Sequence, residues 1–398
     1  MNNYNEVHNP GIADFVHLRP NAVTPMPHSV ESGSRWRTYG SSSGWTSDVY
    51  AAALGEHFER KHFYLDVPID DTAPLQKTLS PEECHSFVKA FSQTSIKTSV
   101  PAIAGHAFDL TRAFRIDNLT PCSVPTACIS ISHSNNEADN DIYPTRDTCG
   151  CSVHLTVEQA ILGALKESFE RQFLLRFWLT NSCTEKIEFH QACQLLQQSR
   201  SLPLLRKLKL AEELTILDLT DSRFPGACVL LCYGNCQQGN VRVKYCAGMA
   251  YSDHLSIALE KSIIELWQTF RFMQSHDHTQ TTHIIDPYLR HFLNCNNYDT
   301  YQLIADTRVS SIRRPTRSTF EPLSARRLID TAKNLSLNGY LYLNNLNTQH
   351  ARYSCKYLSP NVFMHMNNAH KINLENTYST PFLQEIIESR LKCMVPFP

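Results

Sequence analysis

The stretch ALGEHFER, residues 53–60, returns about a hundred residues later as ALKESFER, residues 164–171. Both copies read A-L-x-E-x-F-E-R, so two glutamates and an arginine recur at matched positions. Residues three apart on a helix lie about one turn apart on neighbouring faces. The repeat therefore predicts two helices, each with a pair of carboxylates on one side and an apolar Ala-Leu-Phe anchor on the other.

A single E-x-x-E-R turn is typical of a solvated helix surface with an internal ion pair, and only its repetition indicates a functional site. A third segment, SIIELWQTF, places Glu265 and Gln268 at the same spacing. If these helices converge, their carboxylates repel one another in a cleft of low dielectric unless a cation neutralises them. Mg²⁺ favours such oxygen ligands together with nucleotide phosphates. The spacing thus indicates a Mg–nucleotide site built from helix faces.

Composition limits the class of protein. The 398 residues are 42 % hydrophobic and 19 % charged, and the formal net charge of −1 gives no electrostatic footprint for nucleic acid or for an anionic membrane. The first residues are polar and lack the apolar region of a secretory signal. No apolar run is long enough to span a bilayer. We therefore expect a cytoplasmic protein with neither nucleic acid nor membrane among its partners.

Fourteen cysteines raise the question of a metal–thiolate site. Cys149 and Cys151 are one residue apart, and three residues separate Cys232 from Cys236, but no second pair completes either motif. Most of the others lie in apolar stretches, which favours reduced, buried thiols.

Helical and strand periodicities alternate irregularly along the chain, without regular βαβ spacing and without a Gly-rich phosphate loop. They predict a mixed α+β fold in a single unit over residues 1–398, with a loop-rich segment at 1–45 and a C-terminal helix and Pro-containing tail at 380–398. The expected helices begin near residues 46–48 and at Ser80, and cover 157–177, 254–273 and 380–392; the expected strands are 126–134, 214–219, 227–233, 241–248 and 339–346.

The two glutamate motifs resemble those of the YcaO family, which read S/A-x-x-x-E-x-x-E-R in one helix and E-x(7)-E-x-x-E-R in another. The chain matches them at ALGEHFERKHF and at QAILGALKESFERQFLLRFWL, residues 159–179. The similarity extends to RDTCGCSVH, VKYCAGMAY and the terminal MVPFP. It implies a YcaO-type fold, with mixed sheets and helices that converge on a Mg–ATP site.

The resemblance also implies roles for individual residues. Glu56, Glu59, Glu167 and Glu170 would hold Mg²⁺ and ATP, and Arg171 would contact a phosphate. Gln159 falls where many relatives carry another acid, so its role is open, because an amide can ligate Mg²⁺ only without charge. Glu265 and Gln268 match the third helix of the family less closely.

The family activity implied is ATP-dependent cyclodehydration of a ribosomally made precursor peptide. A Cys thiol or a Ser/Thr hydroxyl attacks the preceding carbonyl, ATP phosphorylates the former amide oxygen, and phosphate departs to leave a thiazoline or oxazoline. The enzyme would be one subunit of an azole-forming bacteriocin synthetase. The chain shows no peptide-binding module and no flavin site, so the expected partners are the precursor peptide, a leader-binding E1-like subunit and an FMN-dependent dehydrogenase subunit.

The C-terminal tail is a further candidate functional feature, and two rival functions are compatible with the motifs. Relatives carry a P-x-P-x-P tail that reaches the active site, and this chain keeps the last two prolines, so Pro398 is the candidate catalytic residue. We expect the tail to contribute little to the core. The rivals are a YcaO enzyme that forms thioamides or amidines, and a non-catalytic scaffold subunit; the retained glutamates disfavour the scaffold.

Overall fold

The structure is a computed structural model of the chain and describes residues 14–19, 26–34, 39–96, 99–134, 136–239, 241–275, 287–310, 322–346 and 351–397. Its packing separates two compact units. The first unit comprises Met1–Leu54, Asn181–Pro322 and Pro396–Pro398, and the second comprises Gly55–Thr180 and Leu323–Val395. One catalytic unit over 1–398 stays a prediction.

The second unit is built on an antiparallel sheet in the order β4-β5-β14-β15-β7, with β6 paired to β5. In its register, Lys356 of β15 pairs with Cys151 of β7. The strands are β4 (Asp71–Ala73), β5 (Phe108–Arg115), β6 (Pro121–Pro125), β7 (Cys151–His154), β14 (Tyr340–Asn345) and β15 (Tyr353–Leu358).

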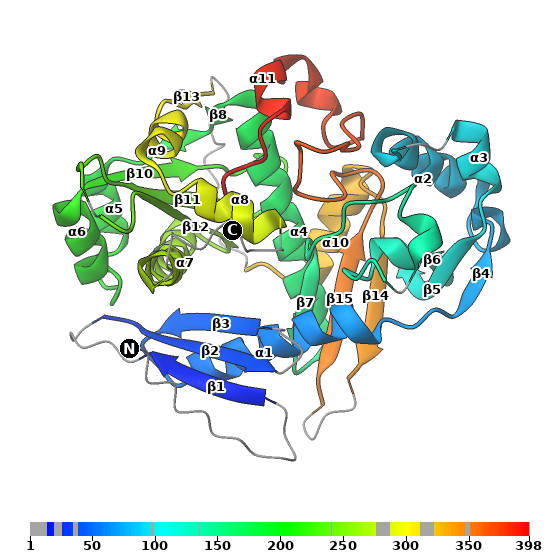
Figure 1. Cartoon of the computed structure of the whole chain (residues 1–398), viewed down its shortest axis with the longest axis horizontal. Coiled ribbons are helices and arrows are strands. Elements are labelled where there is room, and N and C mark those ends of the chain that lie inside the picture. Colours follow the sequence, from blue (N-terminus) through cyan, green and yellow to red (C-terminus); the bar gives the residue numbers. More distant parts are fainter. Residues whose placement is uncertain are drawn as a thin grey trace. The chain divides into compact units, whose positions relative to one another are not determined.

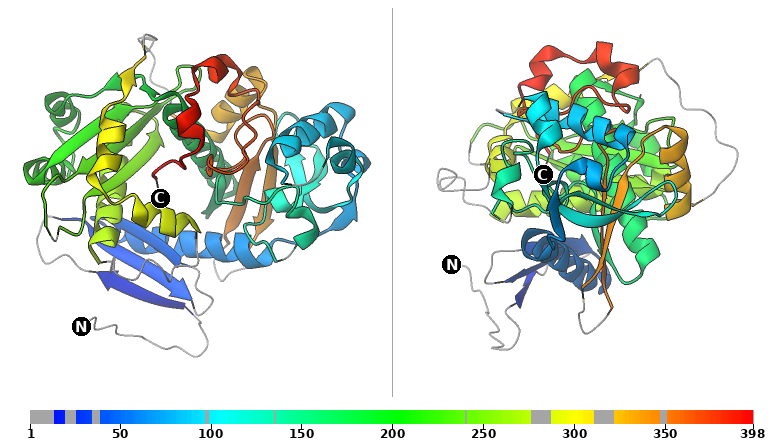
Figure 2. Two further views of the ribbon diagram at one scale, coloured as in Figure 1. Left: turned by 45° about the horizontal axis from the view of Figure 1, so that its top comes forward. Right: turned by 90° about the vertical axis from the view of Figure 1, so that its right-hand side faces the viewer.

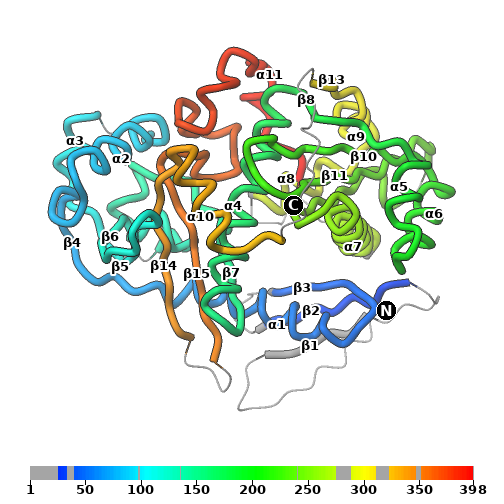
Figure 3. The backbone as a smooth tube through the Cα atoms, turned by 180° about the vertical axis from the view of Figure 1, so that it is seen from behind, coloured from blue at the N-terminus to red at the C-terminus, as the bar shows by residue number. Residues whose placement is uncertain are grey.

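Helices flank this sheet. The 24-residue α4 packs along β7 and β15, and α10 packs against α4, as Figures 1 and 3 show from opposite sides. Ser80 caps α2, where its hydroxyl accepts from the Glu83 N–H at 3.3 Å and the Glu83 carboxylate accepts from the Ser80 N–H at 2.7 Å. The helices are α2 (Pro81–Thr94), α3 (Val100–Gly105), α4 (Val157–Thr180), α10 (Ala325–Asn334) and α11 (Glu388–Leu391).

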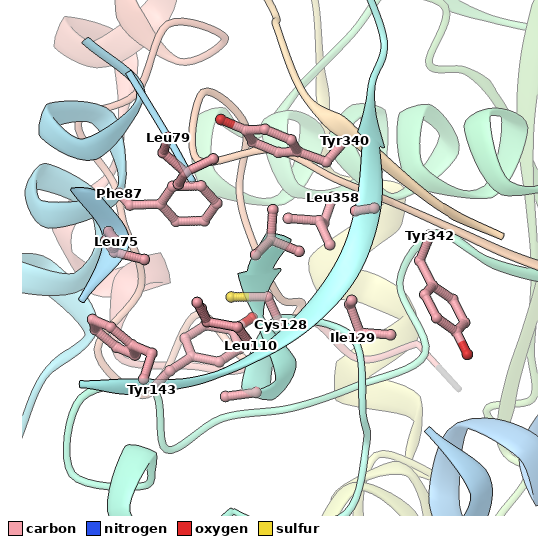
Figure 4. Packing of buried hydrophobic residues seen from close by; sticks show 14 of the residues in the cluster. Leu75, Leu79, Phe87, Leu110, Cys128, Ile129, Tyr143, Tyr340, Tyr342 and Leu358 are labelled. Atoms are coloured by element: carbon pink, nitrogen blue, oxygen red, sulfur yellow. The ribbon is translucent and has the colours of Figure 1, made fainter. Parts of the chain in front are cut away.

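The core of the second unit lies between α2 and the sheet. Figure 4 shows Phe87 and Leu79 facing Tyr340, with Leu110 and Leu358 beside them. These side chains are buried, and complete burial of a Leu or Phe contributes about 1.5–3 kcal/mol relative to exposure. The sheet that carries Lys356 and Cys151 is therefore firmly supported.

The first unit contains the antiparallel sheet β12-β11-β10-β9. Figures 1 and 2 show this sheet, and helices α5, α6 and α7 share one apolar cluster with it. Every residue of β11 and β12 is buried. Its elements are β8 (Ser182–Cys183), β9 (Glu185–Lys186), α5 (Phe189–Leu195), α6 (Leu202–Ala211), β10 (Glu213–Asp218), β11 (Ala227–Gly234), β12 (Tyr245–Ser252), α7 (Leu255–Ser275), α8 (Pro287–Asn294), α9 (Tyr298–Ala305) and β13 (Arg308–Val309), which pairs in parallel with β8.

The expectation of a loop-rich segment at 1–45 is wrong for its described part. Three strands, β1 (Asp14–Arg19), β2 (His28–Ser34) and β3 (Tyr39–Gly44), form an antiparallel sheet. Val30 packs against Val49 and Ala53 of α1 (Asp48–Lys61). The Ser- and Gly-rich composition concealed the strands, whose backbone groups pair with one another.

The expected strand at 126–134 is also wrong. β6 ends at Pro125, a 3₁₀ turn covers Thr126–Cys128, and a buried loop follows. Serine hydroxyls form hydrogen bonds with backbone groups there. The Ser130 hydroxyl donates to the Phe63 carbonyl at 3.3 Å and accepts from the Ser132 N–H at 3.1 Å. The alternating pattern thus reflected local side-chain hydrogen bonding.

Two further boundaries differ. The strand expected at 241–248 begins only at Tyr245, and both of its faces are buried. The helix expected at 380–392 is interrupted, with a 3₁₀ helix at Thr380–Glu385 and the four-residue α11. Ile387 is extended between them, and its N–H donates to the Leu179 carbonyl of α4 at 2.9 Å, so a tertiary hydrogen bond replaces a helical one.

The mixed α+β class and the main helices and strands are confirmed, including α1, α2, α4, α7, β10, β11 and β14. All fourteen cysteines are free, and most are buried. Within the described ranges, no helix combines the length and the apolar character that crossing a bilayer requires.

Candidate functional site

Helix α1 presents the first glutamate pair. Glu56 and Glu59 are partly buried and lie one turn apart, and Arg60 follows directly. The Arg60 Nη2 donates to the Glu56 Oε1 at 3.3 Å, and both side chains are 32 % exposed. Arg60 therefore forms an ion pair with Glu56, a carboxylate of the same motif.

Helix α4 presents the second pair, and close packing fixes its position. Thr156 accepts from the Gln159 N–H at 3.2 Å and begins the helix. At Gly163 a Cβ would lie only 2.3 Å from the Ser152 Oγ of β7, so glycine permits the close approach of helix and strand. Glu167, Glu170 and Arg171, all partly buried, follow within two turns.

Electrostatics show that the glutamates of the two helices converge within the second unit. Burial first, and then the nearby Glu59 carboxylate, raise the pKa of Glu167 well above its usual range, and Arg171 and Arg60 oppose this only in part. Burial and the Glu56 carboxylate raise the pKa of Glu59 to about 7 against the opposing charges of Arg60 and Lys356. The two copies of the repeat therefore form one acidic cluster.

Arg60 lies at the centre of this cluster. Burial alone disfavours its cation, but the carboxylates of Glu56, Glu59 and Glu167 outweigh that effect and raise the pKa of Arg60 above its usual value. The charge of Arg60 thus interacts with three carboxylates from two helices, and its ion pair is with Glu56. The four glutamates still outnumber the nearby cations of Arg60, Arg171 and Lys356, and a divalent cation would relieve that excess.

Strands β7 and β15 lie beside the cluster and supply a second cation. Lys356 is 6 % exposed, and its Nζ donates to the carbonyls of Asp147 at 3.0 Å and Ile129 at 3.3 Å. Its charge lowers the pKa of Glu59. Burial raises the pKa of the neighbouring Cys151 thiol well above its usual value, so this thiol stays protonated.

The predicted residues therefore fall into separate groups. Glu56, Glu59 and Glu167 come together, with Glu170 and Arg171 on the same helix as Glu167. Gln159 lies at the exposed start of α4, where its Oε1 accepts from the Thr156 hydroxyl at 3.1 Å.

Glu265 and Gln268 belong to the first unit. The Glu265 Oε2 accepts from the Met249 N–H of β12 at 2.9 Å, and the Gln268 Nε2 donates to the Ser41 hydroxyl at 2.7 Å. Each side chain thus has a structural partner in its own unit.

The C-terminal tail differs in part from expectation. Pro398 lies outside the described residues. Val395 and Phe397 are 2 % and 5 % exposed, and the Tyr245 hydroxyl donates to the Pro396 carbonyl at 2.7 Å. The expectation that the tail contributes little to the core is therefore wrong for residues 395–397.

No preformed metal cage is present in the described part of the chain, where no three His, Cys, Asp or Glu side chains are grouped as metal ligands. The charges of Glu56, Glu59 and Glu167 all act on Arg60. This arrangement fits Mg²⁺, which needs only one or two protein carboxylates when phosphates and water complete its shell. The donor set is compatible with a metal that arrives with a nucleotide.

Sequence reasoning did not select Arg60 or Lys356 as site residues. Arg60 carried a signal, because it is the arginine of the first repeat and matches Arg171. Lys356 carried none, because its place beside the acidic cluster depends on the pairing of β15 with β7.

A cavity of about 470 Å³ elsewhere in the second unit contains none of these residues. It surrounds the ion pair in which the Arg115 Nε donates to the Glu83 Oε1 at 2.7 Å. That pair ties β5 to the start of α2. Its charges satisfy each other, and we assign it a structural role.

The YcaO family, described as YcaO cyclodehydratase, ATP- and Mg²⁺-binding, matches residues 48–362. The chain belongs to this family of cyclodehydratases. Among known proteins it is similar to the Microcin B17-processing protein McbD of Escherichia coli, with 32 % identity over 91 % of this chain and 90 % of McbD. The α+β YcaO fold and the cyclodehydratase class predicted from the motifs are confirmed.

Solved structures agree. A chain of the E. coli Microcin synthetase McbBCD complex matches with a TM-score of 0.82 and 30 % identity over 96 % of both chains, and so does a chain of that complex with pro-MccB17 bound. The YcaO protein of Methanopyrus kandleri bound with AMPPCP and Mg²⁺ matches at a TM-score of 0.55 and 13 % identity, over 88 % of this chain and 85 % of that one. At that identity the likeness concerns the fold.

Proposed function

We propose that this chain is an ATP-dependent peptide cyclodehydratase that converts Cys, Ser or Thr residues of a ribosomally made precursor to thiazolines or oxazolines. The observation that carries the proposal is the convergence of Glu56, Glu59 and Glu167 on Arg60, from two helices with the same motif. The likeness to McbD over nearly the whole chain supports it. We place the enzyme in the cytoplasm.

The proposed site residues have different roles in binding the metal and the nucleotide. Glu56, Glu59, Glu167 and Glu170 hold Mg²⁺ and, through it, ATP. The resemblance assigns a phosphate contact to Arg171. ATP supplies the phosphoryl group that turns the former amide oxygen into a leaving group.

The chain's own residues neutralise part of the charge of the glutamates and fix the geometry of the site. Arg60 and Lys356 offset the carboxylates before the metal binds, so the cluster tolerates burial without it. Glu59 and Glu167 would hold Mg²⁺ as ionised carboxylates, and the metal's charge would offset the repulsion that remains between them. The rigid helices α1 and α4 fix the geometry, which is the main requirement for phosphoryl transfer.

Three further side chains are proposed as secondary nucleotide contacts, because the family resemblance implies that role for them. They are Gln159, Glu265 and Gln268. Each has a hydrogen bond in the ligand-free chain. We therefore expect smaller effects from their replacement than from replacement of the four glutamates.

The related complex and the family resemblance together support the proposed partners. McbBCD is a synthetase of several subunits and was solved with pro-MccB17 bound. We propose that this chain acts likewise, with a precursor peptide, a leader-binding E1-like subunit and an FMN-dependent dehydrogenase subunit, and that the terminal Pro398 assists the chemistry.

The test is mass spectrometry of the precursor peptide after incubation with the chain, its partner subunits and Mg–ATP, with the dehydrogenase left out. Cyclodehydration predicts an ATP-dependent loss of one water mass for each ring. Replacement of an amide oxygen by sulfur would show a thioamide-forming enzyme instead. An unmodified peptide with no ATP consumption would make the chain a scaffold and contradict the proposal.

A further inference from the structure

Lys356 of β15 carries a buried ammonium group whose hydrogen-bond partners are neutral. The side chain is 6 % exposed, and its Nζ donates to the carbonyls of Asp147 at 3.0 Å and Ile129 at 3.3 Å. Among the residues that the structure describes, no carboxylate forms an ion pair with it. A buried ammonium is costly unless other charges compensate it, so the compensating charges act from beyond hydrogen-bond distance.

Those charges belong to the glutamates of the repeated motif. Phe63 follows Glu59 by four residues, about one helical turn, and the Lys356 Nζ lies 6.0 Å from the centre of the Phe63 ring. In the sheet, Lys356 pairs with Cys151. The charges of Glu59 and Glu167 act on that cysteine thiol. The ammonium therefore lies beside the acidic cluster, within the second unit.

The backbone around Lys356 holds the ammonium in place. Its two carbonyl partners, Ile129 and Asp147, come from the two ends of one loop. The Asp147 carboxylate in turn accepts from the Cys149 N–H at 3.0 Å and from the Met366 N–H at 2.6 Å. A cation held in a buried site acts through a lower effective dielectric than an exposed one. Lys356 is therefore a fixed charge with more influence on the glutamates than a surface lysine has.

The cations near the cluster almost balance its carboxylates. The four glutamates of the repeat are opposed by three cations, which are Arg60, Arg171 and Lys356. A single excess negative charge attracts a bare divalent cation only weakly. A metal–nucleotide complex also brings phosphate oxygens, which the cations can bind while the carboxylates bind the metal. The same set of charges thus favours the complex over the bare ion.

We propose that Lys356 is a specificity-determining residue, which makes the glutamate site select a divalent metal together with a nucleotide and discriminate against the metal alone. The inference deepens the proposed function and rests on it. Lys356 acts through its charge, and a contact with the nucleotide is not required. Without that charge, four carboxylates would face two cations, so the site would attract a bare cation more strongly and phosphates less.

The experiment removes the charge and keeps hydrogen-bond donors. Lys356→Gln retains N–H groups for the carbonyls but is neutral, whereas Lys356→Arg retains the charge. The matched control is Lys371→Gln, which makes the same change of charge at another place in the second unit, where the Lys371 Nζ donates to the Ser95 carbonyl at 2.7 Å. Isothermal titration calorimetry on the full chain measures two affinities, one for Mn²⁺ alone and one for preformed Mn–AMPPCP, a complex of the non-hydrolysable nucleotide.

The two affinities should change in opposite directions. Lys356→Gln should bind Mn²⁺ alone about tenfold more tightly than wild type, and Mn–AMPPCP about tenfold more weakly. Binding of a proton to the glutamates gains from the lost charge as well, but a divalent ion gains about twice as much because it carries two charges. Lys356→Arg and Lys371→Gln should stay close to wild type in both titrations. Structural damage, in contrast, would lower both affinities.

Equal affinities of wild type and Lys356→Gln for Mn²⁺ alone, or a fall in both affinities, would overturn the proposal and leave the nucleotide site in place. Failure of the wild-type chain to bind Mn–AMPPCP would overturn the nucleotide site as well. If Lys356→Gln does not fold, the wild-type chain still provides a test, because it should bind Mn–AMPPCP about tenfold or more tightly than Mn²⁺ alone. Equal or reversed affinities would contradict the selectivity.

Discussion

At Glu59, burial and the neighbouring Glu56 carboxylate raise the pKa, and the cations of Arg60 and Lys356 lower it. The pKa of Glu59 lies near 7 in the folded chain and near 4.5 as an ordinary glutamate. A raised folded pKa means that folding favours the protonated form. The stability linked to this proton is complete below about pH 4.5 and is lost as the pH rises through 7.

Glu59→Gln should therefore stabilise the ligand-free chain, and only at the higher pH. A shift of this size corresponds to about 3 kcal/mol at most, so the free energy of unfolding at pH 8 should rise by roughly 1–3 kcal/mol. At pH 4.5 variant and wild type should agree. Urea unfolding at the two pH values measures this, with Glu137→Gln at an exposed position as control. A loss of stability at pH 8 would contradict the electrostatic account.

The residues of the site could be predicted to the extent that they share a local motif. The repeat identified Glu56, Glu59, Glu167, Glu170 and Arg171, because helical spacing is visible in a single sequence. Lys356 could not be found, because strand register between β15 and β7 decides its neighbours.

At the scale of elements, close helix–strand contacts rest on single glycines. A Cβ at Gly248 of β12 would lie 2.1 Å from the Leu266 backbone nitrogen of α7, so the helix itself must move. At Gly163 of α4 the nearest atom is the Ser152 Oγ, which can rotate away.

Gly248→Ala should therefore destabilise the chain by about 1–3 kcal/mol or more, as overpacking does, because α7 must be displaced from β12. Gly163→Ala should cost clearly less, since the Ser152 side chain can rotate and alanine favours the helix by about 1 kcal/mol over glycine. Chemical denaturation of both variants gives the comparison. An equal loss of unfolding free energy in the two variants would show that α7 can be displaced as easily as the Ser152 side chain can rotate.

The tail gives a further prediction. Phe397 is 5 % exposed, so Phe397→Ala should reduce the free energy of unfolding by about 3–5 kcal/mol, the usual cost of removing a buried phenylalanine. Residues appended after Pro398 should leave stability largely unchanged. Thermal unfolding of the two variants tests this, and an unaltered Tm for Phe397→Ala would show that the tail contributes little to the core after all.

Elements with local signals could be predicted, and those without could not. The Ser80 cap and the helical periodicity of α4 and α7 are encoded in neighbouring residues. The strands of residues 14–44 were missed because Ser and Gly are poor strand signals, and pairing between strands overrides them. The C-terminal helix was overestimated because the bond from Ile387 to Leu179 is a tertiary contact.

At the scale of the whole molecule, the α+β class could be predicted but the sheet order could not. β5 pairs with β14, which lies more than two hundred residues further along the chain, and no local sequence pattern predicts such a pairing. The two compact units are likewise assembled from separated segments, including the last three residues.

Partner dependence is the prediction at this scale. If the chain acts as one subunit of a synthetase, as proposed from its likeness to a chain of the McbBCD complex, it should process its precursor poorly alone. Mixing it with the leader-binding subunit should accelerate cyclisation by orders of magnitude, because that subunit presents the peptide. Time courses of peptide mass, with and without that subunit, measure the effect. Equal rates for the isolated chain would show that it recognises its peptide unaided.

The central claim is that the repeated glutamates form a Mg–ATP site, and Glu167→Gln tests it most directly. The substitution preserves the shape of the side chain and removes a charge that the ligand-free chain barely supports, so the fold should persist. In the complex with partner subunits, precursor and Mg–ATP, we predict that wild type consumes ATP and removes water from the peptide. The Glu167→Gln chain, shown to be folded by circular dichroism, should do neither. ATP consumption and peptide dehydration at wild-type rates in this variant would contradict the account.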